Sequence, residues 1–173
     1  MEFYHINDEY LDYLRENGDR YVPYNKKDRK QRPYIGIITG INDFHYFIPL
    51  HSPKEHKGRF QGRVTDKIYD PDDNEDLLAY LKYNNLIPVK ESEYKLVDFE
   101  SIKSNDPKYY NLIEKERRYL QNKLDRIQNK ARVVHRKFFS DKPEDEFYKR
   151  CCLDFGKLEQ CCLDYPGVNL IDN

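Results

Sequence analysis

The chain lacks any hydrophobic run long enough to cross a membrane. No segment approaches the roughly 18 consecutive apolar residues that a transmembrane helix needs, and the first residues alternate between polar and apolar instead of forming the apolar stretch of a secretion signal. We therefore expect a cytoplasmic protein with no membrane contact. The chain also lacks internal repeats, low-complexity tracts and a glycine-rich phosphate-binding loop, which argues against repeat architectures and P-loop enzymes.

Cysteine is scarce, and its spacing does not suit a metal. The four cysteines form two adjacent pairs, Cys151-Cys152 and Cys161-Cys162, inside a segment with a helical pattern. Neighbouring residues on a helix point to different sides, so such a pair is a poor zinc site. We expect ordinary thiols in a reducing compartment, with metal binding or redox use as the alternative.

The chain has almost no net charge, but its charges are segregated. The formal net charge is -1 at pH 7. Residues 26–32 hold five Lys or Arg and one Asp, residues 70–76 hold five acidic residues, and residues 108–137 hold ten Lys or Arg and three acidic residues. Because local fields rather than the total charge attract phosphate, each basic block is either a solvated face or a contact with nucleic acid.

Aromatic residues are abundant in this otherwise polar chain. It contains 16 Tyr and 9 Phe, although its hydrophobic fraction is 38% and its mean hydropathy is -1.01. These rings supply the large apolar surface that disordered chains lack, so we predict one folded domain over residues 1–173. A tyrosine ring can be half-buried or can stack on a nucleobase, and composition leaves both roles open.

The first hundred residues predict an antiparallel sheet. A short strand over residues 2–6 is followed by Asn7-Asp8, which can cap a helix over residues 9–16. Two β-branched or aromatic runs, 34–41 and 44–50, flank Asn42-Asp43 and predict a hairpin. Further predicted strands cover residues 64–69, 77–83, 87–90 and 93–97, of which 77–83 could instead be helical, while 51–63 form a polar loop and 70–76 an acidic turn.

The last third of the chain predicts helices. Residues 107–140 carry apolar side chains at a spacing of seven, which predicts one long amphipathic helix whose seam is Ile113, Leu120, Ile127 and Val134. A second helix is predicted over residues 144–163, ending before Pro166-Gly167. The seam can pack on the sheet or on a partner helix.

Several stretches resemble one family of bacterial toxins. They are Glu2-Phe3-Tyr4-His5-Ile6 with Tyr10 and Leu14 following, Pro33-Tyr34-Ile35-Gly36-Ile37, the segment Tyr46-Phe47-Ile48-Pro49-Leu50-His51-Ser52-Pro53-Lys54, and Tyr83-Asn84-Asn85-Leu86-Ile87-Pro88-Val89. In this order they are similar to the ToxN/AbiQ endoribonucleases of type III toxin-antitoxin systems. The segment that ends at Lys54 is the most specific of the four, and the matches span most of the first 140 residues.

The resemblance implies a fold, an activity and a partner. The fold would be α+β, a twisted antiparallel sheet of about six strands flanked by helices, similar to the MazF-like toxins. The activity would be cleavage of single-stranded RNA without a metal or other cofactor, leaving a 2′,3′-cyclic phosphate and a 5′-hydroxyl. The partner would be a repeat antitoxin RNA whose pseudoknots close with the toxin into a cyclic assembly, serving abortive infection against phage, and mRNA rather than DNA would be the substrate.

The polar loop after the second hairpin strand supplies residue types that suit this chemistry. Attack of a 2′-oxygen on phosphorus needs a base, cations or donors for the phosphorane charge, and an acid for the departing 5′-oxygen. We assign Lys54 to the non-bridging oxygens and Ser52 to a hydrogen bond with phosphate. Arg32, which precedes the first hairpin strand at a position where the family has a basic residue, is assigned to a bidentate grip. His51 replaces the Thr of many relatives and is a candidate base or phosphate contact, since histidine ordinarily titrates near pH 6.5, with a structural hydrogen bond as the alternative. For Ser52 and Lys54 the alternative is a solvated turn.

The remaining candidates are predicted to contact RNA without taking part in the chemistry. They are Tyr10 on the first helix, for which the resemblance implies an RNA contact and a place in the core is the alternative, and the loop cations Lys26, Lys27, Arg29, Lys30, Lys57, Arg59 and Arg63. Two other functions stay open from sequence alone. One is a non-catalytic RNA-binding module that uses the basic helix 108–137, and the other is a coiled-coil adaptor built on the seam of residues 113–134.

Overall fold

The core of the protein is an antiparallel sheet. The computed structural model describes residues 2–23, 35–53 and 61–166. Seven strands form the sheet in the order β4-β5-β3-β2-β1-β7, with β6 paired to β3. Their bounds are Tyr4–Ile6 (β1), Ile35–Ile41 (β2), Phe44–His51 (β3), Thr65–Asp70 (β4), Asp73–Lys82 (β5), Ile87–Val89 (β6) and Tyr94–Leu96 (β7). The predicted α+β class is confirmed, and residues 77–83 belong mostly to a strand rather than to a helix.

The predicted hairpin is formed by β2 and β3. Ile37 lies opposite Ile48, and Ile41 lies opposite Phe44. The turn contains Asn42, whose φ of 50° lies in the left-handed region that asparagine tolerates better than most residues. The acidic segment 70–76 is less of a turn than predicted, because β5 already begins at Asp73.

Gly36 of β2 is required by a close approach of the neighbouring strand. A Cβ at this position would lie 2.3 Å from the carbonyl oxygen of Ile48 and 2.6 Å from the ring of Phe47. Gly36→Ala is therefore expected to lower the free energy of unfolding by about 1–3 kcal/mol, because the strands would have to separate. Gly40→Ala in the same strand is the control: a Cβ there meets nothing within 4 Å, so stability should be unchanged or rise by up to about 1 kcal/mol. An equal decrease in the free energy of unfolding for both variants, measured by urea unfolding, would contradict this explanation.

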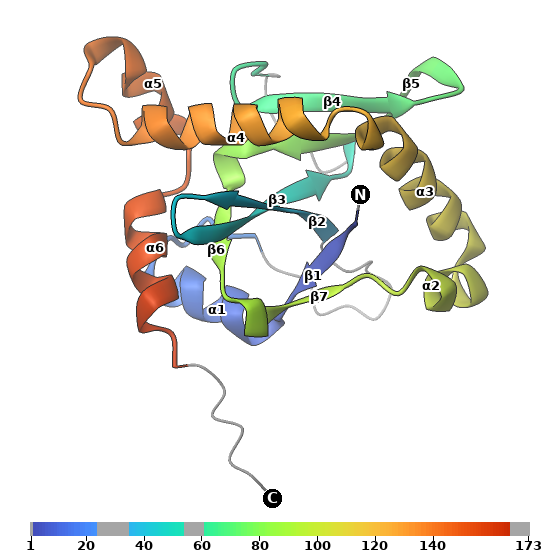
Figure 1. Ribbon diagram of the computed structural model, residues 1–173, viewed down its shortest axis with the longest axis horizontal. Coiled ribbons are helices and arrows are strands. Elements are labelled where there is room, and N and C mark those ends of the chain that lie inside the picture. The colour runs from blue at the N-terminus through green and yellow to red at the C-terminus, as the bar shows by residue number, and fades with distance from the viewer. Residues whose placement is uncertain (1, 24–34, 54–60, 167–173) are drawn as a thin grey trace, which may run out of the picture.

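Helices surround the sheet, and α4 lies across one side of it (Figure 1). Their bounds are Asp8–Asn17 (α1), Phe99–Asn105 (α2), Pro107–Gln121 (α3), Leu124–Phe138 (α4), Glu146–Cys151 (α5) and Phe155–Asp164 (α6). The predicted cap of the first helix is confirmed, since the Asn7 side chain accepts a hydrogen bond from the Glu9 backbone N–H. None of the described helices combines the length and apolar character that a membrane span needs.

The prediction of one helix over residues 107–140 is wrong. The chain turns at Asn122 and Lys123, and α3 and α4 are separate helices. The apolar spacing does not reveal the break, because Leu120 and Ile127 on either side of it are both buried against the same core. The predicted helix over 144–163 is also divided, and α6 begins anew because the Asp154 side chain caps it by accepting the Lys157 backbone N–H.

The C-terminal helix α6 completes the core. Cys161 and Cys162 are buried there, whereas Cys151 and Cys152, at the end of α5, are partly buried. All four thiols are free. Within the three described segments, no group of three or more His, Cys, Asp or Glu side chains could hold a metal ion.

Candidate functional site

The candidate site lies at the end of β3, where the polar loop begins. His51 is the last residue of the strand, and Ser52 after it is exposed. In the sheet His51 lies opposite Tyr80 of β5, and Tyr80 lies opposite Lys67 of β4. Side chains at directly opposite positions share one face, with Cβ atoms roughly 4.5–5.5 Å apart. An imidazole, a phenol and an ammonium group therefore form one row, which we call the His51 row.

The His51 row projects from the side of the sheet opposite α4. The neighbouring row of the register is formed by Leu50, Leu81 and Asp66, and successive residues of a strand point to opposite faces. The Asp66 carboxylate makes an ion pair with Lys130 of α4 at 2.6 Å. Because α4 occupies the side of Asp66, His51 points to the other side.

Two members of this row were not singled out in the sequence. Lys67 of β4 lies 13 residues beyond Lys54, and Tyr80 of β5 lies 29 residues beyond His51. Only the register of the sheet places Tyr80 beside His51 and Lys67 on the far side of Tyr80. Alternation within each predicted strand gives the face of a residue but not its cross-strand neighbour. Together with Ser52, the row offers a possible base, a cation and two hydroxyl groups.

Most of the other predicted site residues lie outside the described residues. These are the predicted catalytic residues Lys54 and Arg32 and the predicted RNA contacts Lys26, Lys27, Arg29, Lys30, Lys57 and Arg59. Their roles stay predictions. Arg63 is described and exposed, and its guanidinium carbon lies 5.3 Å from the centre of the Phe147 ring of α5.

The prediction that Tyr10 contacts RNA does not fit its position. Its side chain is fully buried, and the hydroxyl donates a hydrogen bond to the carbonyl oxygen of Pro88 at 2.7 Å. The ring also packs edge-on against Tyr165 at 4.8 Å between centres. Burial raises the pKa of this phenol well above its ordinary value. Tyr10 is thus a core residue that joins α1 to the sheet, and it has no surface on which a base could stack.

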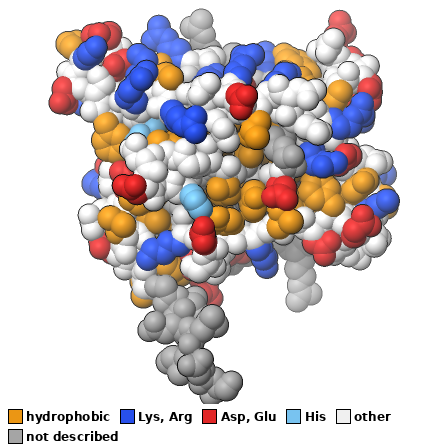
Figure 2. Space-filling view, viewed as in Figure 1, with side chains coloured by type: hydrophobic (Ala, Val, Ile, Leu, Met, Phe, Trp, Pro, Cys, Tyr) orange, Lys and Arg blue, Asp and Glu red, His pale blue; other side chains and the backbone are white. Residues whose placement is uncertain are grey.

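The basic segment 108–137 is largely neutralised within the molecule. On the face in Figure 2, Lys and Arg side chains gather along α4 and α5. Six of the ten cations of this segment make ion pairs with described carboxylates: Lys115, Arg117, Arg118, Arg126, Lys130 and Lys137. The ion pair of Arg126 is long, at 4.0 Å. This weakens the alternative in which the whole basic helix forms an RNA-binding face.

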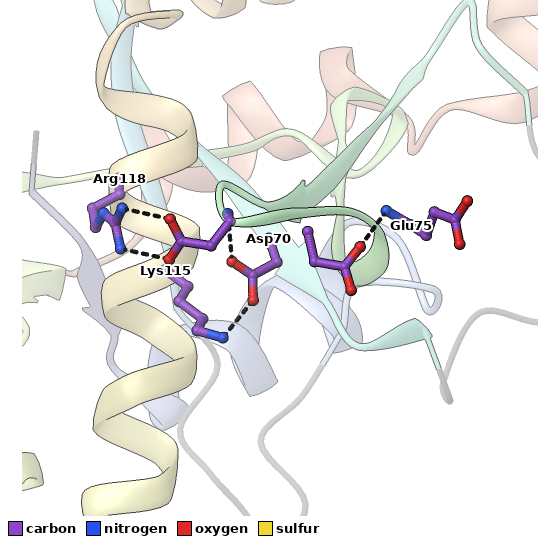
Figure 3. A network of polar contacts seen from close by, with 6 residues as sticks. Asp70, Glu75, Lys115 and Arg118 are labelled. Atoms are coloured by element: carbon purple, nitrogen blue, oxygen red, sulfur yellow. Dashed lines mark hydrogen bonds and ion pairs between the residues drawn. The ribbon is translucent and has the colours of Figure 1, made fainter.

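The acidic turn between β4 and β5 supplies part of this neutralisation (Figure 3). Lys115 of α3 donates a hydrogen bond to Asp70, and Arg118 donates two to Asp72 at 3.1 and 3.2 Å. The predicted acidic block is therefore a partner of α3 rather than a solvated turn.

The pair between Asp70 and Lys115 makes stability depend on pH. The hydrogen bond from Lys115, helped by the backbone N–H of Asp72, holds the pKa of Asp70 below its ordinary value. Such a carboxylate stabilises the fold above the ordinary pKa near 3.9, and the contribution is lost as the pH falls through the lowered pKa. Asp70→Asn should therefore lower the urea midpoint at pH 7, and its difference from wild type should shrink below pH 4. Asp73→Asn, an exposed change in the same turn, should leave the midpoint unchanged, and a difference for Asp70→Asn that stays constant down to pH 3 would contradict the ion-pair explanation.

The apolar seam of the predicted long helix is not available to a partner chain. Ile113, Leu120, Ile127 and Val134 are each no more than 2% exposed. They pack into the protein's own core. The coiled-coil adaptor is therefore ruled out as the use of this seam.

Comparisons with known proteins agree with one another. A family model described as toxin ToxN of type III toxin-antitoxin systems matches residues 2–162. The chain is 38% identical over 167 residues to Endoribonuclease ToxN of Bacillus thuringiensis subsp. kurstaki, covering 95% of this chain and 84% of that protein. A solved structure from work on type III toxin inhibition by a non-coding RNA pseudoknot has a TM-score of 0.83 and 37% identity, over 95% of this chain and 96% of that chain. The structure of AbiQ, a lactococcal anti-phage endoribonuclease of the type III systems, has a TM-score of 0.77 and 29% identity, with the same coverage.

Proposed function

Because this chain belongs to the ToxN family of toxins from type III toxin-antitoxin systems, we propose that it is an endoribonuclease that cleaves single-stranded RNA at the His51 row without a metal. The observation that carries the proposal is the meeting of His51, Tyr80 and Lys67 on one face of the sheet, at the strand end that leads into Ser52. Each of these side chains has a place in the reaction.

The reaction is a transfer of phosphate within the RNA chain. The 2′-oxygen attacks the neighbouring phosphorus, the bond from phosphorus to the 5′-oxygen breaks, and a 2′,3′-cyclic phosphate and a 5′-hydroxyl result. His51 takes the 2′ proton. Lys54 and Lys67 stabilise the negative charge on the non-bridging oxygens, with Ser52 donating a hydrogen bond and Arg32 gripping the phosphate.

The departing 5′-oxygen needs a proton as its bond to phosphorus breaks. Tyr80 carries a phenol next to His51 in the row and is our candidate for this acid. The proton that His51 takes from the 2′-hydroxyl is returned to solvent and Tyr80 takes one back from solvent, so both groups end the turnover in their starting states.

The partner of the toxin in the cell would be an antitoxin RNA. The related structure described above was reported with selective inhibition by an RNA pseudoknot, and AbiQ is described as an anti-phage enzyme. We propose that this chain processes a repeat RNA, is inhibited by the resulting pseudoknots in a cyclic assembly with them, and acts on cellular or phage mRNA during infection.

Incubation of the purified protein with A-rich single-stranded RNA in EDTA tests the activity. We expect fragments with a 5′-hydroxyl and a cyclic phosphate, which a phosphatase leaves intact until acid opens the ring. Ser52→Ala and Lys54→Ala are expected to abolish growth arrest in cells that express them. RNA that is shifted on a gel but stays whole would favour the non-catalytic RNA-binding module, and growth arrest by both variants would refute the site.

A further inference from the structure

A second feature of the surface lies at the other end of β3. A hollow of about 970 Å³ opens between the last turns of α4 and the turn that joins β2 to β3. We call it the α4 pocket and define it by Ile41, Asn42, Arg132, Arg136, Phe139 and Lys142, all of which line it. Since β3 runs from Phe44 to His51, roughly 23 Å of strand separate the turn from the His51 row.

Two cations of the α4 pocket, Arg132 and Arg136, make no ion pair with a carboxylate among the described residues, whereas Lys142 lies close enough to Asp145 to help lower the pKa of that carboxyl. Arg132 donates a hydrogen bond to the neutral side chain of Asn129 at 3.3 Å, and no ion pair joins Arg136 or Lys142 to a described acid. All three side chains are exposed. The absence of an ion pair sets Arg132 and Arg136 apart from the six paired cations of the segment 108–137.

The acidic groups that line the pocket are already engaged. Asp145 accepts a hydrogen bond from Lys137 at 2.6 Å. Glu159 accepts one from the Tyr46 hydroxyl at 2.5 Å and lies 2.8 Å from Nε2 of His135, which donates to the carboxylate. The pocket thus offers the charges of Arg132 and Arg136 to a ligand, while its carboxylates are held by hydrogen bonds within the protein.

The same Glu159 network holds the walls of the pocket in place. It joins β3, α4 and α6 through Tyr46, His135 and Glu159, of which Tyr46 and His135 are buried. The His135 ring is also stacked on Phe155 of α6, with 6.0 Å between centres and 9° between planes. Arg132 and Arg136 belong to the helix that this network holds in place. Binding a ligand there therefore loses little backbone entropy.

An apolar wall completes the pocket. Phe139 is 46% exposed, although its ring lies 4.9 Å from that of His135, and Ile41 is buried at the base. An exposed ring beside two arginines suits a ligand that has both a flat aromatic part and an anionic part. A nucleotide has both, and bare phosphate has only the second.

We infer that the α4 pocket binds one nucleotide unit of an RNA chain, with its phosphate on Arg132 and Arg136 and its base against Phe139. This inference rests on the proposed RNA-cleaving function, because that function brings RNA to the protein. The pocket lies at the other end of β3 and on the α4 side of the sheet, away from the His51 row, so it would be a separate contact with the RNA. A free nucleotide carries the same base and phosphate groups as a unit of RNA, so the test must distinguish binding of RNA from binding of a free nucleotide.

The test measures binding of a 12-nucleotide, fully 2′-O-methylated RNA carrying fluorescein, by anisotropy. Such RNA cannot be cleaved by attack of a 2′-hydroxyl. Arg132→Ala/Arg136→Ala is expected to weaken binding about 10- to 30-fold and to reduce the slope of log affinity against log salt by about 1.4, the value for two phosphate contacts on a single strand. Phe139→Ala should weaken binding about 5- to 10-fold with the slope unchanged, because a stacking contact releases no counterions.

The matched control is Lys108→Ala/Lys123→Ala. It removes the same charge from α3 and from the turn before α4, at two cations that also lack a described carboxylate partner but lie outside the pocket. Binding should weaken less than 3-fold. Equal weakening by the two double variants would overturn the inference, because any loss of positive charge would then have the same effect. A pocket variant that no longer binds AMP but binds RNA as tightly as wild type would also overturn it, because the pocket would then be a site for free nucleotide.

The outcome is independent of whether the protein cleaves RNA. Failure of the wild type to cleave unmodified RNA would refute the proposed nuclease while leaving the binding measurement to decide the pocket. Conversely, a pocket variant that cleaves a short RNA normally and binds the 12-nucleotide probe as tightly as wild type would refute the pocket alone. Both arginines are exposed, and unchanged thermal unfolding confirms that each variant is folded.

Discussion

His51→Ala is expected to lower the rate of RNA cleavage by about 10²- to 10⁴-fold, the range usually lost with a general base. The imidazole lies at the end of β3, beside Tyr80 of β5, and β5 separates it from Lys67 of β4. Without it the 2′-hydroxyl must give its proton directly to water. The measurement is single-turnover cleavage of a labelled RNA at saturating enzyme, which separates the chemical step from binding.

The control for His51 lies on the same strand and the same face. His45 is six residues earlier in β3, and its Nδ1 is 3.0 Å from the Tyr94 hydroxyl near the other end of the sheet. His45→Ala should cleave RNA within about 3-fold of wild type, since it stands far from the proposed base. Cleavage by His51→Ala at the wild-type rate, or an equal loss in both variants, would remove His51 from the role of base.

Phe155→Ala is expected to lower the free energy of unfolding by about 3–5 kcal/mol, as is usual for a buried ring cut down to a methyl group. Phe155 is fully buried at the start of α6. Its ring centre lies 4.7 Å from that of Phe138 and 6.2 Å from that of Tyr46, so the loss would leave a cavity between α4, α6 and β3. Urea unfolding followed by circular dichroism measures the change.

Leu163→Ala on the same helix provides the comparison. Leu163 is 63% exposed, and its removal should change stability by no more than about 0.5 kcal/mol. If Phe155→Ala lowers the free energy of unfolding no more than Leu163→Ala does, the described packing of α6 on α4 is contradicted.

Local features of the fold could be predicted from the sequence. The Asn7 cap and the hairpin around Asn42 depend on residues that are close along the chain, and both are confirmed. The break at Asn122 was missed because the apolar spacing runs through it unchanged. Propensity alone does not forbid Asn inside a helix, and packing on the core decides where the helix ends.

Features that depend on distant residues could not be predicted. The pairing of Asp70 with Lys115 joins positions 45 residues apart, and the His51 row depends on a register across three strands. The resemblance to known toxins pointed to the segment that holds Ser52, and His51 was a candidate because it replaces the Thr of many relatives. Lys67, Tyr80 and the α4 pocket could be found only once the sheet and helices were assembled. The fully buried ring of Tyr10 shows that a match at one position does not by itself make that residue a ligand contact.

Among the described strands, β4 and β7 end the main path of the sheet, while β6, which α6 packs against, branches from β3 and is also paired on one side only. An uncovered edge can recruit a strand of another molecule and start aggregation. Here α3 packs against β4, and β7 is three residues long with Lys95 exposed at its middle. Short length and charge are devices that disfavour such pairing, so the sheet is protected against growing from one molecule into the next even when many copies accumulate.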